Sequence, residues 1–251
     1  MSDPFYSSKY SITRAKHHIS DFERQIVEFD NTNPYIFIID TDADTSEQIH
    51  KVKLVKPMPD ALPAIASDTV HNLRSALDQT IYALKLISGN TANESTLFPF
   101  ADNAANFQNT VKGRCKQLPK EIVALICAFQ PYKGGNNLLW ALNKLSNTNK
   151  HAIVRPVILT TGNINITGGV ITGGLIFNSR VWDRTKNEIE VFRQPKGGTL
   201  SSNVNVTVHI AMCDVEFVDG KPAIAVLNAL VRIVESIVLA LEAESRRIGL
   251  L

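Results

Sequence analysis

The chain has few cysteines, and this scarcity excludes two classes of small stabilised domain. Its 251 residues contain three, Cys115, Cys127 and Cys213, an odd number spread widely along the chain. A disulfide framework needs paired cysteines at regular spacings, and a zinc ribbon needs two close pairs. Neither pattern is present, so the sequence predicts a cytoplasmic protein in a reducing compartment.

The chain also lacks a large excess of charge of one sign. Its formal net charge is +2 at pH 7, whereas dedicated nucleic-acid binders usually carry a concentrated basic face. Two local basic clusters remain candidates for a binding patch, although a run of charge is more often a solvated face. They are Lys51, Lys53 and Lys56, and Lys112, Arg114, Lys116 and Lys120.

No signal peptide is indicated, because Met1 to Tyr6 shows no charged region followed by an apolar core. One long apolar run, Pro222 to Leu241, contains Arg232 and Glu235. Each of these charges would cost about 2.5 to 3.5 kcal/mol near the centre of a bilayer. We therefore predict a buried core helix here, and no membrane partner.

Signature motifs of cofactor sites, metal sites and nucleophiles are missing as well. The chain has no Gly-x-Ser-x-Gly elbow, no Gly-Lys-Ser/Thr phosphate loop and no Gly-x-Gly-x-x-Gly. His17 and His18 are adjacent in a predicted helix and point about 100° apart, so they cannot bind one metal ion together. The glycine pairs after Thr167 and Thr172 predict β-bulges or sharp twist. We expect no cofactor and no metal.

The first part of the sequence has a strong helical pattern. Apolar residues recur every three or four positions over residues 8–30 and 65–86, which predicts two amphipathic helices, the second one central. The C-terminal helix has an apolar stripe wider than one face, so it predicts contact with both layers of the fold or with a second copy in a homodimer. The other expected helices cover residues 104–117, 119–129, 136–147 and 222–246.

β-branched residues that alternate with polar ones dominate the later part of the sequence. The order of helices, then an antiparallel sheet of four or five strands, then a long C-terminal helix packed on that sheet predicts an α+β fold. We expect one integrated domain over residues 1–251, mostly helical up to residue 150. The expected strands are a small hairpin at 35–40 and 49–55, then 153–159, 163–167, 188–192 and 204–210, joined by 215–218.

The main candidate site is a polar stripe on the central helix. His71, Arg74, Asp78 and Tyr82 are three or four residues apart, so they lie on one side of the helix beside its apolar seam. Arg74 and Asp78 can form an i,i+4 ion pair. Lys150 and His151, in an Asn-Lys-His segment, complete the constellation.

The stripe has a functional and a structural interpretation. In the functional one, Arg74 binds an anion or phosphate, and Lys150 and Tyr82 are further ligand contacts. His71 or His151 is a general acid or base, and Asp78 fixes Arg74 in place. In the structural one, the same residues form hydrogen bonds that tie a long helix to its neighbours. The sequence leaves both open.

The sequence resembles two known families. His71-Asn-Leu-Arg-Ser-Ala-Leu-Asp78, Phe98-Pro99, Gln130-Pro131-Tyr132 and the Leu142 to His151 segment resemble a family of uncharacterised bacterial proteins with an HNLRxALD motif and a later (D/N)KH motif. The likeness covers about residues 60 to 155. It implies a bacterial or phage origin and assigns no activity.

The second resemblance is to HEPN-type helical ribonucleases, in which an Arg is followed on the same helix by a catalytic His. Arg74 matches the Arg, whereas Gln79 stands where the His would be and cannot act as an acid or base. His71 or His151 would have to replace it.

Two functions follow. The leading expectation is a non-enzymatic binding or interaction protein from a defence or mobile-element context, with RNA or another anionic ligand as partner. The alternative is a metal-independent ribonuclease that uses Arg74 with His71 or His151.

Overall fold

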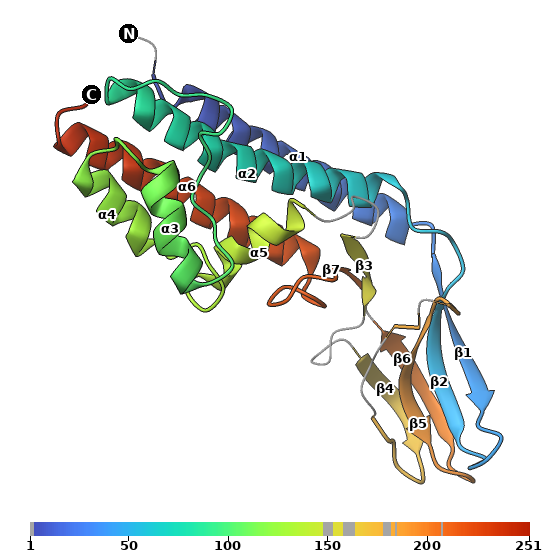
Figure 1. Ribbon diagram of the computed structural model, residues 1–251. Coiled ribbons are helices and arrows are strands. Elements are labelled where there is room, and N and C mark those ends of the chain that lie inside the picture. The colour runs from blue at the N-terminus through green and yellow to red at the C-terminus, as the bar shows by residue number, and fades with distance from the viewer. Residues whose placement is uncertain (1–2, 148–152, 158–163, 178–181, 184, 207) are drawn as a thin grey trace. The chain divides into compact units, whose positions relative to one another are not determined.

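The computed structural model describes residues 3–147, 153–157, 164–177, 182–183, 185–206 and 208–251. In this part of the chain, helices and strands together confirm the predicted α+β class (Figure 1). The helices are α1 (Tyr6–Asp30), α2 (Ala61–Ile87), α3 (Ala104–Arg114), α4 (Lys120–Ala128), α5 (Asn137–Leu145) and α6 (Ala223–Arg247). The strands are β1 (Tyr35–Thr41), β2 (Gln48–Leu54), β3 (Val154–Val157), β4 (Ile164–Ile171), β5 (Glu188–Gln194), β6 (Leu200–Val206) and β7 (His209–Met212).

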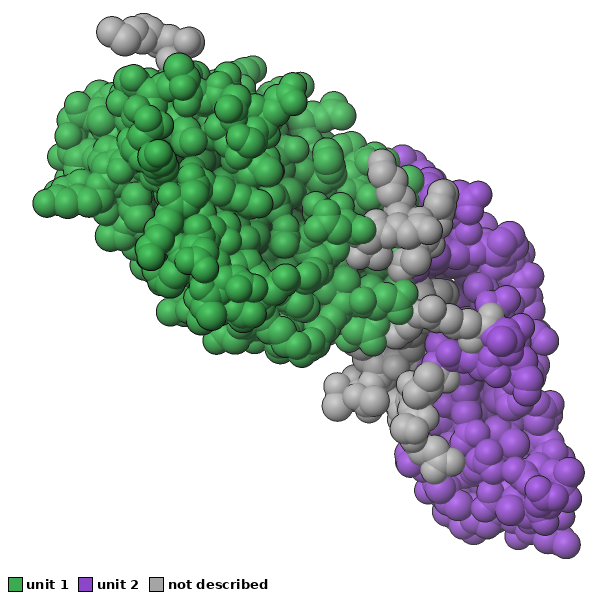
Figure 2. All heavy atoms as spheres, viewed as in Figure 1, with its two compact units in different colours: residues 1–23, 63–153, 212–251 green, residues 24–62, 154–211 purple. Residues whose placement is uncertain are grey.

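The chain divides into two compact units, each built from segments distant in sequence (Figure 2). Unit 1 contains residues 1–23, 63–153 and 212–251, and unit 2 contains residues 24–62 and 154–211. The N-terminal hairpin is therefore grouped with the later strands, and α6 with the earlier helices. This grouping differs from the expected order, in which the sheet and the last helix formed one half. The difference arises because the apolar stripe of α6 is buried among helices of unit 1.

The predicted apolar seams of α1 and α2 are buried. Along α2, all five predicted core residues are fully buried, because their spacing places them on one face of the helix: Val70, Leu73, Leu77, Ile81 and Leu84. α2 begins four residues earlier than predicted, so that Pro63 lies inside its first turn rather than in an extended entry. A proline is tolerated there because the first N–H groups of a helix need no intrahelical partner.

Polar ties connect α1 to both of its neighbours in unit 1. Thr80 Oγ1 on α2 donates to Ser8 Oγ at 3.0 Å. Lys9 and Lys16 form ion pairs with Glu242 and Glu235 of α6, both at 2.6 Å. Burial alone would raise the pKa of Glu242, but its bonds to Lys9 and Arg246 lower it overall. The carboxylate can therefore stay charged in the helical core.

α6 is long and apolar enough to cross a membrane by length and composition alone. In this structure most of its apolar stripe is covered by the chain itself: Leu227, Leu230, Val231, Val234, Ile237, Val238 and Leu241 are buried. Arg232 is exposed. These observations support the predicted core helix, and the homodimer through α6 stays a prediction.

The strands form three small sheets in the described residues, rather than the expected single sheet of four or five strands. β5 pairs antiparallel with β2, so the order of the largest sheet is β1-β2-β5. β4 pairs antiparallel with β6, and its register shifts between Thr167 and Val170. Gly168 and Gly169, both with positive φ, occupy that shift, so the predicted bulge is confirmed. Residues 215–218, expected to extend the sheet, instead form turns.

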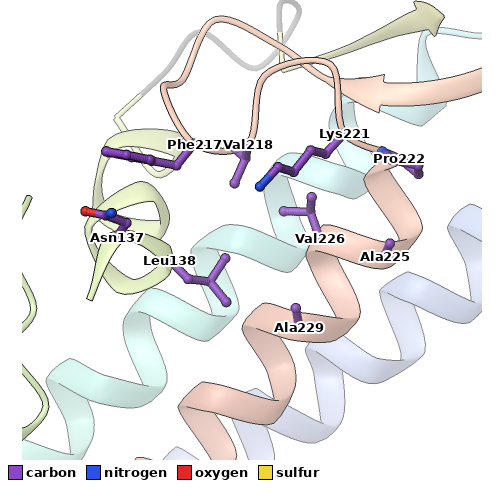
Figure 3. Close-up of a pocket in the computed structure, with 9 residues that line it drawn as sticks. All are labelled: Asn137, Leu138, Phe217, Val218, Lys221, Pro222, Ala225, Val226 and Ala229. Carbon is purple, nitrogen blue, oxygen red and sulfur yellow. The ribbon is translucent and has the colours of Figure 1, made fainter. Parts of the chain in front are cut away.

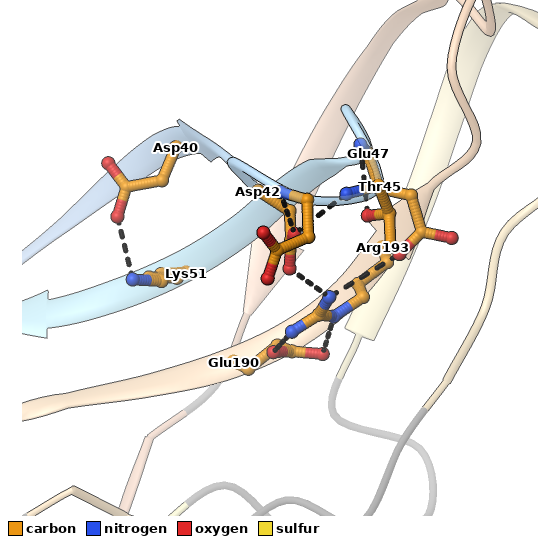
Figure 4. A network of polar contacts seen from close by, with 8 residues as sticks. Asp40, Asp42, Thr45, Glu47, Lys51, Glu190 and Arg193 are labelled. Atoms are coloured by element: carbon orange, nitrogen blue, oxygen red, sulfur yellow. Dashed lines mark hydrogen bonds and ion pairs between the residues drawn. The ribbon is translucent and has the colours of Figure 1, made fainter.

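A network of ion pairs connects the loop between β1 and β2 to β5 (Figure 4). Arg193 on β5 bonds both oxygens of Glu190, at 2.9 and 3.0 Å, and reaches Asp42 at 2.8 Å and Glu47 at 3.3 Å. The backbone N–H of Thr45 and the Arg193 guanidinium lower the pKa of Asp42 to about 2. One guanidinium of the same sheet thus pairs with Asp42 and Glu47 of the acidic loop and with Glu190.

His50 is a buried polar residue in the core of unit 2. It is 1% exposed and stacks on Phe192, with ring centroids 4.4 Å apart. Neither ring nitrogen has a hydrogen-bond partner within the described structure. Burial lowers the pKa of His50, and the neighbouring Gln194 side chain partly opposes this effect.

We predict that His50→Phe removes part of the acid sensitivity of the protein. The folded state keeps His50 neutral at a pH where the unfolded chain, with a pKa near 6.5, binds a proton. The free energy of unfolding therefore decreases as pH falls below about 6.5. A phenyl ring does not titrate, so His50→Phe removes this part of the pH dependence. Urea unfolding between pH 5 and 7.5 measures it. An unchanged slope of unfolding free energy against pH would contradict the prediction.

Candidate functional site

The polar stripe of α2 lines a pocket in unit 1. Its volume is about 410 Å³, within the usual range for small-molecule sites. Three elements besides α2 contribute to the wall: the segment 97–100, the end of α3, and α5 with the residues after it. The lining residues are His71, Arg74, Ser75, Asp78, Leu97, Phe100, Arg114, Asn143, Ser146 and Asn147.

Arg74 is fixed on three sides. Its Nε donates to Asp78 Oδ2 at 3.2 Å, one turn further along α2. Its Nη1 donates to Asn143 Oδ1 of α5, and its guanidinium carbon lies 4.3 Å from the centre of the Phe100 ring. Such a cation–π contact stabilises a desolvated guanidinium by about 0.5 to 2 kcal/mol. Arg74 is therefore held in one orientation at the pocket wall.

Asp78 links α2 to the segment that follows it. While Oδ2 accepts from Arg74, Oδ1 accepts the backbone N–H of Phe98 at 2.7 Å. Phe98 is fully buried, and its ring lies 4.9 Å from that of Phe100. The Asp78 carboxylate thus anchors the apolar segment Leu97-Phe98-Pro99-Phe100, which we call the apolar clamp, to the central helix.

Arg114 brings a second guanidinium to the same pocket. It is the last residue of α3, and its Nη1 donates to the carbonyl oxygen of Phe98 at 2.7 Å. Burial lowers the pKa of Arg114, the positive charge of Arg74 lowers it further, and Asp78 opposes both. Two like charges therefore share one carboxylate in a partly desolvated site.

The rim of the pocket carries neutral polar groups. Ser75 and Ser146 offer hydroxyl groups, and Asn147 donates to the carbonyl oxygen of Asn143 at 3.0 Å. His71 lines the pocket one turn before Arg74 and is exposed to solvent. Its imidazole is thus accessible to a molecule bound at Arg74.

The other predicted site residues lie elsewhere. Tyr82 is 43% exposed and lines a neighbouring hollow, which shares only Asp78 with the Arg74 pocket. Gln79 accepts a hydrogen bond from Ser11 of α1 at 3.1 Å and so serves helix packing. Lys150 and His151 lie outside the described residues.

Sequence reasoning missed Arg114, Asn143 and Phe100 as members of the site. The sequence indicated Arg114 only as one member of the basic cluster formed with Lys112, Lys116 and Lys120. The Leu-Phe-Pro-Phe clamp was the available signal for Phe100, because a segment that packs on the polar side of α2 must contact its stripe. Nothing in the local pattern around Asn143 distinguishes it from an ordinary helical asparagine.

The arrangement can bind an anion. Arg74 and Arg114 supply two positive charges against the one carboxylate of Asp78. Among the described residues, Nη2 of both arginines and Nε of Arg114 remain available as donors. A guanidinium matches the geometry of phosphate and carboxylate. Among the described residues no group of three or more His, Cys, Asp or Glu side chains could hold a metal ion.

Comparison of the chain with models of protein families, with curated proteins and with solved structures gave no match.

Proposed function

We propose that this chain is a binding protein whose Arg74 pocket holds a phosphate-type anion, either free or as part of a larger ligand such as RNA. One observation carries the proposal: two guanidinium groups line a pocket that contains a single carboxylate among the described residues. A bound anion would supply the missing negative charge. Two partly buried cations with one counter-charge have an unfavourable electrostatic free energy. A bound anion makes this free energy more favourable.

The fixation of Arg74 supports the same proposal. Asp78, Asn143 and Phe100 hold the guanidinium before any ligand arrives, so little side-chain entropy is lost on binding. The serine hydroxyls and the amide of Asn143 can donate to further oxygens of the anion. We place the protein in a bacterial or phage cytoplasm, on the resemblance of its motifs and on the odd number and wide spacing of its cysteines.

We predict that wild-type protein binds inorganic phosphate in the millimolar range or tighter, and that Arg114→Gln weakens this binding by about tenfold. One charge-assisted hydrogen bond is worth about 1.5 to 3 kcal/mol, and tenfold corresponds to about 1.4 kcal/mol. Arg114 is a better target than Arg74 because its side chain makes one hydrogen bond within the described residues, to Phe98. Isothermal titration calorimetry at constant ionic strength measures the effect.

Lys116→Gln is the matched control. Lys116 lies two residues after Arg114, is exposed and does not line the pocket, so the substitution removes one positive charge from outside the site. The proposal fails if wild type does not bind phosphate, or if both variants lose affinity equally, since that would mean only general attraction by surface charge.

A metal-independent ribonuclease is the second candidate. The observation in its favour is that His71 and Arg74 line one pocket from the same helix, so a general acid or base stands beside an anion-binding guanidinium. Its test is incubation of total bacterial RNA with the protein and a chelator. Cleavage that disappears in both Arg74→Lys and His71→Gln would establish catalysis, and phosphate binding without cleavage would leave the binding function alone.

A further inference from the structure

A second pocket in unit 1 has a different chemistry (Figure 3). Its volume is about 510 Å³, and it is formed by the start of α5, the turn that precedes α6, and the first turns of α6. Seven of its nine lining residues have apolar side chains, and two of these are alanines, whose small side chains leave the space open. The lining residues are Asn137, Leu138, Phe217, Val218, Lys221, Pro222, Ala225, Val226 and Ala229.

Lys221 is the one charged residue that lines this pocket. Figure 3 shows its side chain extending over the cavity, with the nitrogen between Val218 and Val226. The backbone on either side is fixed: the N–H of Lys221 donates to Val218 O at 3.0 Å, and its carbonyl accepts from Met212 N at 2.9 Å. The nearby Glu216 carboxylate is paired with Lys133 at 2.6 Å. No ion pair of the Lys221 ammonium occurs in the described part of the chain.

The start of α6 and Asn137 provide further hydrogen-bond donors around the cavity. α6 begins at Ala223, and its N-cap Pro222 provides no side-chain hydrogen bond to the first N–H groups of the helix. These groups lack intrahelical partners and favour a negative charge. On the opposite wall, Asn137 accepts the N–H of Gly134 through Oδ1 at 2.8 Å, which leaves its amide nitrogen as a donor.

The turn that carries these groups is strained. Asp214 and Phe217 both adopt positive φ, at 62° and 72°. This conformation is uncommon for residues other than glycine, asparagine and aspartate, so it is most unfavourable at Phe217. Here it places the Phe217 ring over the cavity wall, edge-on to Trp140 with centroids 5.7 Å apart.

From the apolar lining, the single cation and the absence of a lining carboxylate, we propose that this cavity binds a free medium-chain fatty acid. The alkyl chain would lie along Leu138, Val226 and Ala229, and the carboxylate would meet the Lys221 ammonium and the start of α6. This site is separate from the Arg74 pocket, with which it shares no lining residue.

The test compares three probes with the same eight-carbon chain: octanoate, octanol and octylamine, each below its micelle concentration. We expect octanoate to bind wild type, with shifts of the Ala225 and Ala229 amide signals in nitrogen–proton NMR spectra, and the other two to bind at least about tenfold more weakly. Equal binding of octanol, or no binding of octanoate, overturns the proposal.

Variants locate the site. Lys221→Gln removes the charge of an exposed side chain but keeps it polar, and should weaken octanoate binding by about tenfold. Ala229→Phe fills the cavity from its wall and should abolish binding, while Lys116→Gln and Arg114→Gln should leave it unchanged. Unchanged affinity in Lys221→Gln, or a loss in Arg114→Gln, refutes the assignment. Phosphate binding by Lys221→Gln reports separately on the Arg74 pocket, so the two proposals can fail independently.

Discussion

Asp78→Ala is expected to lower the free energy of unfolding by about 3 kcal/mol. The substitution leaves Arg74 and Arg114 without their shared carboxylate, and it leaves the Phe98 N–H without its acceptor. Breaking a buried ion pair by removing one partner costs about 3 to 5 kcal/mol, and the side chain of Asp78 is still 20% exposed, which places the effect at the lower end. For a chain of this size the melting temperature falls by roughly 6 to 12 °C. Urea and thermal unfolding followed by circular dichroism measure both quantities.

The control is Asp102→Ala. Asp102 forms an ion pair with Lys144 at 2.6 Å, but its side chain is 66% exposed. Removing such a surface pair costs about 1 kcal/mol or less. Equal losses in the two variants would show that the Asp78 contacts do not anchor the 97–100 segment to α2.

Much of the fold follows from local pattern. The seams of α1 and α2 were predictable because a helix repeats its buried face every three or four residues, and Val70, Leu73 and Leu77 obey this spacing. The single-sheet arrangement was not predictable in the same way. Pairing of β5 with β2 joins residues such as Ile189 and Val52, which are far apart in the chain. Alternation predicts that a segment is a strand, but it does not name its partner.

The same limit explains the site. The i,i+4 relation of Arg74 and Asp78 is a property of one helix, so the sequence predicted it and the structure confirms the pair. Arg114 and Asn143 reach the pocket only through the packing of α3 and α5 on unit 1, which no spacing in the sequence encodes. Missing Arg114 changes the interpretation of the site. Arg74 and Asp78 alone form a neutral pair, whereas the pocket with both arginines has an excess of positive charge.

Asp78→Asn is expected to raise the affinity for phosphate by about tenfold while it destabilises the protein by about 1 to 2 kcal/mol. The amide oxygen can still accept the Phe98 N–H, so the anchor of the clamp is retained. The loss of one negative charge raises the formal charge of the two arginines and residue 78 from +1 to +2. At an effective dielectric constant of about 20, one unit charge some 5 Å from the anion changes binding by a few kcal/mol before salt screening, which makes tenfold a conservative expectation.

This opposite movement of stability and affinity separates the two interpretations of the polar stripe. If Arg74, Asp78 and Arg114 only tie helices together, then Asp78→Asn destabilises the protein and phosphate binds neither form. If they form an anion site, the variant is less stable without ligand and gains more stability on adding phosphate than wild type does. A ligand at concentration c that binds only the folded state stabilises it by RT ln(1 + c/Kd), which is larger for the tighter-binding protein at the same phosphate concentration. Melting temperatures of both proteins over a phosphate titration, with chloride at matched ionic strength as reference, therefore decide the question. Curves that stay parallel would assign the stripe to structure alone.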